Sequence, residues 1–226
     1  MPTKFSRLLA CILAVVLLCS GCGSGPASPD ETGSNNTPAA QSASSAEQGQ
    51  SASSGEAKEL IFGLSTEPST LEPVLVQGQS KRTVLLNIYR GLVSFNSASG
   101  ELVKELAESY TIADDNITYT FVLHDAKFHN GDTVTAADVK FTLERILNPD
   151  NGATYRNELS IIDAMKVVDD KTIEIKLKNP CTPFIQYLAL PECGIVSEKW
   201  TNEHSGDLTA NPMGAGPFEF VSWASG

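Results

Sequence analysis

Residues 23–57 constrain this chain most, because they contain no aromatic, valine, leucine or isoleucine side chain. A segment of this composition cannot bury enough apolar surface to offset the entropy lost when a chain becomes ordered. We therefore expect a polar tether here, and a packed fold only in residues 58–226. A flexible coil of this length has a root-mean-square reach of roughly 30–35 Å.

The first 21 residues have the order of a secretory signal. Lys4 and Arg7 precede an unbroken apolar run from Leu8 to Leu18, and small residues follow. The run is short for a bilayer span, so we predict an exported protein with a signal peptide over residues 1–21. The letters LCSGC, which end at Cys22, resemble the bacterial lipobox and imply acylation of that cysteine. A plain signal peptide cut near the same place is the alternative.

The charge of the chain limits its partners. The formal net charge is −11 at pH 7, and loss of the signal would make the remainder more negative by two charges. This sign argues against binding nucleic acid and against lying flat on anionic lipid. We expect no nucleic-acid partner, and attachment to the membrane through the lipid on Cys22 and the tether over residues 22–57.

The segment VLHDAKFHNGDTVTAADVKF, residues 122–141, is the densest group of chemically capable side chains. It places His124, Asp125, His129 and Asp132 within nine positions. Such a cluster is compatible with a metal site, with an acid–base pair, or with a strand that runs through a turn into a helix.

Local patterns favour the structural interpretation. Apolar and polar residues alternate over 116–124, which predicts a half-buried strand. Asn130-Gly131 predicts a type I′ turn, because both residues accept positive φ. Thr135 stands three residues before Asp138, as in a helix capping box, and the predicted helix stops at Asn148-Pro149. We therefore expect no metal site in this segment.

The other segments predict a mixed α/β fold. Residues 58–64 are expected to form a buried first strand, and residues 80–93 a helix with one apolar face. Two strands are expected on either side of Asp169-Asp170. A last strand is predicted over residues 218–221, and its apolar side chains have no later segment to pair with. We therefore expect this sequence to be the front part of a longer protein.

The chain lacks the common catalytic motifs. It has no G-x-S-x-G, Walker A, G-x-G-x-x-G or H-E-x-x-H sequence, so we expect neither an enzyme nor a cofactor. Cys181 and Cys193 form a candidate disulfide in an exported protein. The alternative is that both are small buried residues.

Several motifs in order carry a family resemblance. After the lipobox and tether come FGLSTEPSTLEP, a helix ending in YRGLV, LAESYTIADDNITYTFVLHDAKFHNGDTVTAADVKFTLERI, and PMGAGPFEF. The chain resembles the extracellular solute-binding proteins of bacterial peptide and nickel ABC importers, the oligopeptide- and dipeptide-binding family. The resemblance covers residues 58–226. His124 stands where the family usually has arginine or lysine, and Ala215 where it usually has threonine.

The resemblance implies a bilobal, periplasmic-binding-protein-like α/β fold with mixed sheets. The first lobe would comprise residues 58–79 and 181–226, and a small side lobe residues 80–180. The opposing C-terminal lobe would lie outside this sequence, because members of the family are more than twice as long.

The implied function is capture of oligopeptides or dipeptides between two lobes, for delivery to an ABC permease and its ATPase. The protein would sit on the extracellular or periplasmic face of the cell membrane. Gln77, Gly78, Gln79 and Tyr155 match family positions near the ligand. A nickel chelate, an oligosaccharide or an opine-like ligand remains open, as does a surface lipoprotein for signalling or adhesion.

Overall fold

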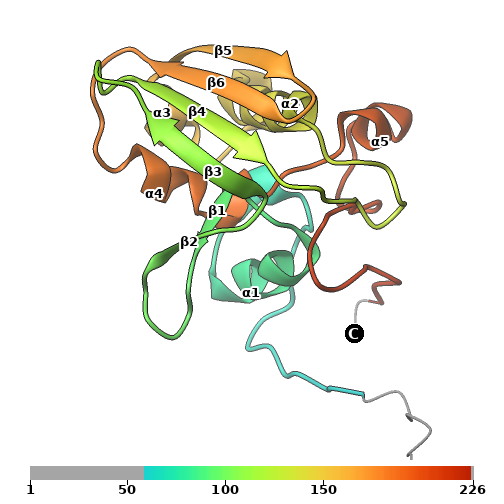
Figure 1. Ribbon diagram of the computed structural model, residues 1–226. Helices are drawn as coiled ribbons and strands as arrows, with labels where there is room; N and C mark the ends of the chain where they lie inside the picture. Colours follow the sequence, from blue (N-terminus) through green and yellow to red (C-terminus); the bar gives the residue numbers. More distant parts are fainter. Residues whose placement is uncertain (1–58, 225–226) are drawn as a thin grey trace, which may run out of the picture. The chain divides into compact units, whose positions relative to one another are not determined.

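The fold is built on an antiparallel sheet of four strands in the order β3-β4-β6-β5 (Figure 1). These strands are β3 (Ala107–Ile112), β4 (Thr118–Leu123), β5 (Ile162–Asp169) and β6 (Thr172–Leu177). The computed structural model describes residues 59–224, which belong to one structural unit. The predicted signal peptide and tether, together with Cys22, fall outside the described residues.

Strand β4 is as predicted. Tyr119, Phe121 and Leu123 are buried, whereas the alternating residues Thr118, Thr120 and Val122 are half-buried. Because side chains alternate across a strand, this pattern presents one apolar face to the core. The Phe121 ring lies 5.6 Å from that of Tyr110 on β3.

The hairpin of β5 and β6 is also as predicted. Its turn is closed by Asp169, whose carboxylate accepts a hydrogen bond of 2.8 Å from the backbone N–H of Lys171. On β6, Ile173, Ile175 and Leu177 are buried on the same face as the apolar residues of β4. The hairpin therefore extends the apolar face of the sheet.

Helix α2 (Ala136–Leu147) covers that face (Figure 1). The predicted capping box is present: the Thr135 hydroxyl accepts from the Asp138 N–H, and the Asp138 carboxylate accepts from the Thr135 N–H at 2.9 Å. The apolar stripe of Val139, Leu143 and Ile146 is buried against the strands. The helix ends before Pro149, because the residue that precedes a proline disfavours helical backbone.

The Asn130-Gly131 turn differs from the predicted type I′. Only Gly131 has positive φ, at 87°, and its N–H donates to the Phe128 carbonyl. Asn130 and Gly131 are therefore the third and fourth residues of the turn, where a type I turn favours glycine last. Backbone contacts of Phe128 with Asp132 and of Val134 with Ala126 set this geometry.

The remaining elements surround a second, smaller apolar cluster and the margins of the sheet. The predicted helix over 80–93 is α1 (Gln79–Ile88), which stops early because Tyr89 is extended and Val93 enters a strand. The other elements are η1 (Pro73–Leu75), β1 (Val93–Phe95), β2 (Leu102–Lys104), η2 (Pro149–Asn151), α3 (Arg156–Leu159), α4 (Phe184–Leu188), η3 (Pro191–Cys193) and α5 (Glu198–Glu203). The smaller cluster consists of Leu71, Val76, Leu85, Ile88, Tyr89, Val196 and Leu208.

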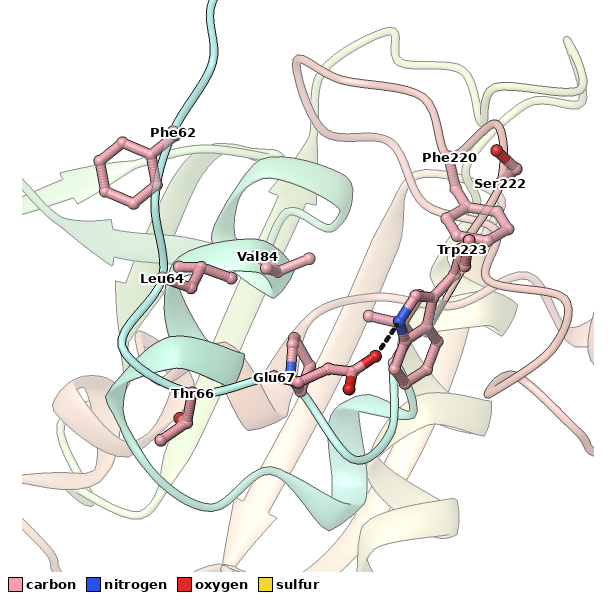
Figure 2. A pocket seen from close by; sticks show the side chains of 11 residues that line it. Phe62, Leu64, Thr66, Glu67, Val84, Phe220, Ser222 and Trp223 are labelled. Atoms are coloured by element: carbon pink, nitrogen blue, oxygen red, sulfur yellow. Dashed lines mark hydrogen bonds between the residues drawn. The ribbon is translucent and has the colours of Figure 1, made fainter. Parts of the chain in front are cut away.

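The strands predicted over residues 58–64 and 218–221 are wrong for the residues that the structure describes. Residues 59–64 and 219–224 are irregular and form no backbone ladder within the described part. Their apolar side chains, including Phe62, Val221 and Trp223, are exposed. Phe62 and Trp223 border an open groove (Figure 2). An apolar sequence becomes a strand only where another backbone satisfies its N–H and C=O groups.

The predicted lobe boundaries at residues 80 and 180 stay predictions. The two apolar clusters each draw on both sides of these boundaries. Within residues 59–224, no helix has the length and apolar character needed to cross a bilayer.

Replacing Thr135 with alanine tests the cap of α2. We expect the free energy of unfolding to fall by about 1–2 kcal/mol, because the helix start loses its hydroxyl acceptor. Urea unfolding monitored by circular dichroism measures the change. Thr182→Ala, at an exposed threonine with no side-chain hydrogen bond, is the control and should be nearly neutral. Equal effects of both variants would contradict the structural role of the cap.

Candidate functional site

The start of α1 presents the first three predicted ligand residues. Gln77, Gly78 and Gln79 are exposed, and Gly78 is the N-cap with φ 86°. Because φ is positive, this position favours glycine. Gly78 offers no capping side chain, and its carbonyl accepts from the Arg82 N–H at 3.3 Å. The positive end of the helix dipole and two side-chain amides therefore face solvent together.

Tyr155, the fourth predicted residue, is joined to the same helix by Arg82. The Arg82 Nη2 donates to the Tyr155 hydroxyl at 2.9 Å, and the guanidinium carbon lies 5.7 Å from the ring centroid. The tyrosine is placed there because the Thr154 N–H donates to the Val74 carbonyl at 3.0 Å. Arg82 thus contacts Gly78 through its backbone and Tyr155 through its side chain, and Gln77 and Gln79 flank Gly78 in the sequence.

Glu192 on η3 completes this group, and sequence reasoning missed both it and Arg82. The Arg82 Nη2 also donates to Glu192 Oε1 at 2.7 Å. The Arg82 side chain is 29% exposed, whereas that of Glu192 is 1% exposed. The pair links residues 110 positions apart, so no local spacing signals it.

The charges at this site are shifted by burial and by each other. Burial raises the pKa of the Glu192 carboxyl, and the Arg82 guanidinium opposes the rise without cancelling it. The Glu192 Oε2 atom is buried and has no partner in the described part of the chain. Because this oxygen gains no hydrogen bond, burial outweighs the attraction of Arg82 and the pKa stays raised. Burial acts to lower the pKa of Arg82, but the hydrogen bond to Tyr155 and the charge of Glu192 raise it overall.

A second buried ion pair lies between η1 and α2. The Arg145 Nη2 donates to Glu72 Oε2 at 2.7 Å, and the two side chains are 13% and 7% exposed. Burial raises the pKa of Glu72 against the opposing charge of Arg145. The hydroxyl of the buried Tyr89 donates to the Leu71 carbonyl beside this pair. These contacts fix the segment that leads into residues 77–79.

The arrangement around Arg82 suits a polar solute that carries a carboxylate. Nη2 makes both protein contacts of the guanidinium, so Nε and Nη1 keep their N–H groups free of partners among residues 59–224. A guanidinium presents these donors in a planar fork that matches a carboxylate. Glu192 holds the arginine in place while the exposed Gln77 and Gln79 amides offer both donors and acceptors.

The dense polar segment contributes separate structural contacts instead of one centre. Asp125 pairs with Lys171, and Asp132 pairs with Lys199 at 3.2 Å. The His129 ring contacts the Gly216 carbonyl at 3.0 Å. Among the described residues, no group of three or more His, Cys, Asp or Glu side chains is arranged to hold a metal ion.

The predicted partners Cys181 and Cys193 are both free thiols in the structure. Cys193 is buried and its sulfur donates to the Tyr187 carbonyl at 3.3 Å, whereas Cys181 is half-buried. Burial raises the pKa of the Cys193 thiol, so this side chain is a poor nucleophile in the folded state. The structure therefore shows two packed thiols in place of the predicted disulfide.

The sequence matches a known family model over residues 101–226. The model describes bacterial extracellular solute-binding proteins, family 5, middle part. The chain belongs to this family. The match covers more than half of the chain and includes β3, β4 and the capped helix α2.

A related protein of known function is the glutathione-binding protein GsiB of Pectobacterium atrosepticum. It is 35% identical over 168 residues, which cover 74% of this chain and 32% of that protein. The chain thus spans about a third of the length of this relative.

Two solved structures of binding proteins share the fold. AgaA from A. tumefaciens R10, in complex with agropinic acid, is 49% identical with a TM-score of 0.67. The similarity covers 70% of this chain and 32% of AgaA. DppA from Helicobacter pylori, in complex with the peptide STSA, is 28% identical with a TM-score of 0.63. That similarity covers 69% of this chain and 35% of DppA, so the predicted family and periplasmic-binding-protein-like fold are confirmed.

Thiol labelling distinguishes the two cysteines. We expect iodoacetamide to modify Cys181 in the native protein and to reach Cys193 only after unfolding, because Cys193 is buried with a raised thiol pKa. Peptide mapping by mass spectrometry with and without urea measures both. A cross-linked peptide containing Cys181 and Cys193 in the non-reduced protein would contradict the free thiols.

The pH dependence of stability tests Glu192. Its raised pKa means that the folded chain binds this proton more tightly than the unfolded chain. The resulting stabilisation is fully present below the ordinary value of 4.5 and is lost as pH rises through the folded-state pKa. Hence the unfolding free energy of the wild type relative to Glu192→Gln should decrease from pH 4 to pH 7 in urea titrations. Glu158→Gln, at an exposed glutamate, is the control. An unfolding free energy of the wild type that increases relative to that of Glu192→Gln from pH 4 to pH 7 would refute the raised pKa.

Proposed function

We propose that the chain belongs to the substrate-binding protein of an ABC importer, which captures a small peptide or a peptide-like carboxylate. The observation that carries this proposal is the convergence of Arg82, Tyr155 and Glu192 beside the exposed residues 77–79. An anchored, partly exposed guanidinium next to free amides can bind a ligand carboxylate and its neighbouring polar groups. This role needs no catalytic residue and no cofactor.

The relatives support this class of ligand. GsiB is described as binding glutathione, DppA was solved with a peptide, and AgaA was solved with agropinic acid. We propose that a short peptide is the ligand, with an opine-like carboxylate as the second candidate. AgaA has the higher sequence identity of these two solved structures, at 49%, and this identity supports the opine-like candidate.

The complete receptor would work by closing a second lobe over this surface. Such a receptor binds its ligand between two lobes, and a permease would distinguish the closed from the open state by differential affinity. We further propose that Cys22 carries a lipid anchor and that the tether lets the binding domain reach the permease from the membrane surface. A surface lipoprotein without a transport role is the alternative, and genes for a permease and an ATPase beside this one would disfavour it.

Binding measurements on the product of the complete reading frame test the ligand and the site. Glutathione, a dipeptide, agropinic acid and a nickel–histidine chelate are the probes, and isothermal titration calorimetry is the measurement. Arg82→Met should weaken binding of the preferred carboxylate by about 10- to 100-fold, because a charge-assisted hydrogen bond is lost. Lys81→Met, the adjacent position on α1, is the matched control and should bind like the wild type.

The possible outcomes separate the parts of the proposal. Unchanged affinity in Arg82→Met would reject this arginine as the carboxylate anchor. Binding of the nickel chelate alone would reject the peptide-like ligand class. Failure of all probes to bind or to raise the midpoint of thermal unfolding would argue for the non-transport alternative.

A further inference from the structure

The two carboxyl oxygens of Glu192 lie in different surroundings. Oε1 accepts from Arg82 Nη2 at 2.7 Å, whereas Oε2 is buried and has no hydrogen-bond partner among residues 59–224. The side chain is 1% exposed, so it is closed to bulk water. A buried anion that lacks part of its hydrogen bonding costs more free energy than a neutral carboxyl group at the same place. Protonation of Glu192 would therefore relieve part of this cost.

The hydrogen bond that positions Arg82 does not require a charge on Glu192. The guanidinium donates to Oε1, and the carbonyl oxygen of a neutral carboxyl group accepts such a bond as a carboxylate does. A proton on Oε2 therefore leaves this contact in place, together with the contact between Arg82 and the Tyr155 hydroxyl. The proton removes only the negative charge that Arg82 balances.

A ligand carboxylate at Arg82 would change this balance of charge. Without a ligand, the guanidinium contacts one carboxylate, that of Glu192. A second carboxylate on Nε and Nη1 would give two negative charges on one positive charge, and a like charge raises the pKa of a carboxyl group. Glu192 is the group that would respond, because burial already raises its pKa and Arg82 opposes the rise only in part.

The other titratable groups near Glu192 do not take its place. Helix α1, η1 and α2 pack against η3. Glu72, which caps η1, and Arg145 of α2 form an ion pair of their own at 2.7 Å. Burial, and then the charge of Glu192, raises the pKa of the neighbouring Cys193 thiol, which therefore stays neutral. Glu192 is thus the acid in direct contact with the guanidinium that would receive the ligand.

We propose that carboxylate capture at Arg82 is coupled to protonation of Glu192, so that the site binds a ligand anion and a proton together. This coupling rests on the proposed function of the site, and it is reciprocal, since each partner favours binding of the other. Affinity for the anion is highest at low pH, where Glu192 is neutral with or without ligand. It falls as pH rises from the pKa of Glu192 in the free site to the higher pKa in the occupied site.

Calorimetry on the product of the complete reading frame tests the coupling, with glutathione and agropinic acid as the probes. At pH 6 the heat of binding should depend on the ionisation enthalpy of the buffer, because the wild type takes protons from the buffer as it binds. From pH 5.5 to pH 7.5 the affinity of the wild type should fall about 3- to 10-fold relative to that of Glu192→Gln. Glu158→Gln, at an exposed glutamate on α3, is the matched control and should behave like the wild type.

The Glu192→Gln variant distinguishes the coupling from a purely structural role of this residue. The glutamine carbonyl still accepts from Arg82 but carries no charge, so the variant should take up less proton than the wild type. At pH 7.5 it should bind the probe about 3- to 10-fold more tightly than the wild type, because no second anion competes for the guanidinium. Weaker binding by folded Glu192→Gln at every pH would show that the negative charge is needed, and would overturn the coupling.

The buffer dependence of the wild type needs no variant, so the test stands even where Glu192→Gln does not fold. A probe that binds with the same heat in all buffers would overturn the coupling and leave the proposed function intact. Failure of both probes to bind would overturn the coupling together with the proposed carboxylate ligand.

Discussion

The buried carboxylate of Asp138 is the interaction on which much of this structure depends. Its Oδ2 accepts from both the N–H and the hydroxyl of Thr135, and its Oδ1 accepts from the Glu198 N–H at 2.9 Å. One side chain thus starts α2 and also attaches the segment that follows η3. Thr142, one turn later, accepts from the Val196 N–H at 3.0 Å and strengthens the same attachment. The sheet, its covering helix and the segment bearing Glu192 are therefore held in one frame.

Within that frame, the buried Arg145–Glu72 pair and the half-buried Arg82–Glu192 pair set the position of α1 and of the residues before it. A buried pair contributes little net stability, because desolvation of two charges offsets their attraction. The Arg145 Nε and Glu192 Oε2 atoms are buried without partners in residues 59–224, so each pair carries an uncompensated cost. Such pairs nevertheless restrict geometry strongly, because only one arrangement satisfies the remaining donors and acceptors. This restriction accounts for the fixed guanidinium of Arg82 beside an otherwise open helix start.

Local sequence patterns predicted correctly the elements whose deciding contacts lie between residues that are close in the sequence. The alternation in β4, the Asp169-Asp170 hairpin and the Thr135–Asp138 cap are all present, because each depends on residues within a few positions of one another. The strands expected over 58–64 and 218–221 are missing from the described residues, because a strand requires a partner that its own sequence cannot supply. The Asn130-Gly131 turn lies at the predicted position but is not of the predicted type, because the bridge between Lys127 and Thr133 sets its backbone geometry.

The sequence predicted only part of the candidate site, because the contact between Arg82 and Glu192 joins residues that are far apart in the chain. Family resemblance pointed to Gln77, Gly78, Gln79 and Tyr155, whose proximity the structure explains. Arg82 is one of several polar residues on an amphipathic helix, and nothing nearby distinguishes it from Lys81. Glu192 stands between Pro191 and Cys193, and no neighbouring residue marks it as the partner of an arginine 110 positions away.

The polar segment at residues 122–141 shows that polar side chains close together in the sequence need not form one site. A shared centre requires side chains that converge, whereas successive residues in a strand and a turn point in different directions. Asp125 reaches Lys171, Asp132 reaches Lys199, and His129 reaches the backbone of Gly216, so their partners lie in three separate segments. His124 turns back to the backbone carbonyls of Asp125 and Glu105, so none of the four side chains shares a partner with another.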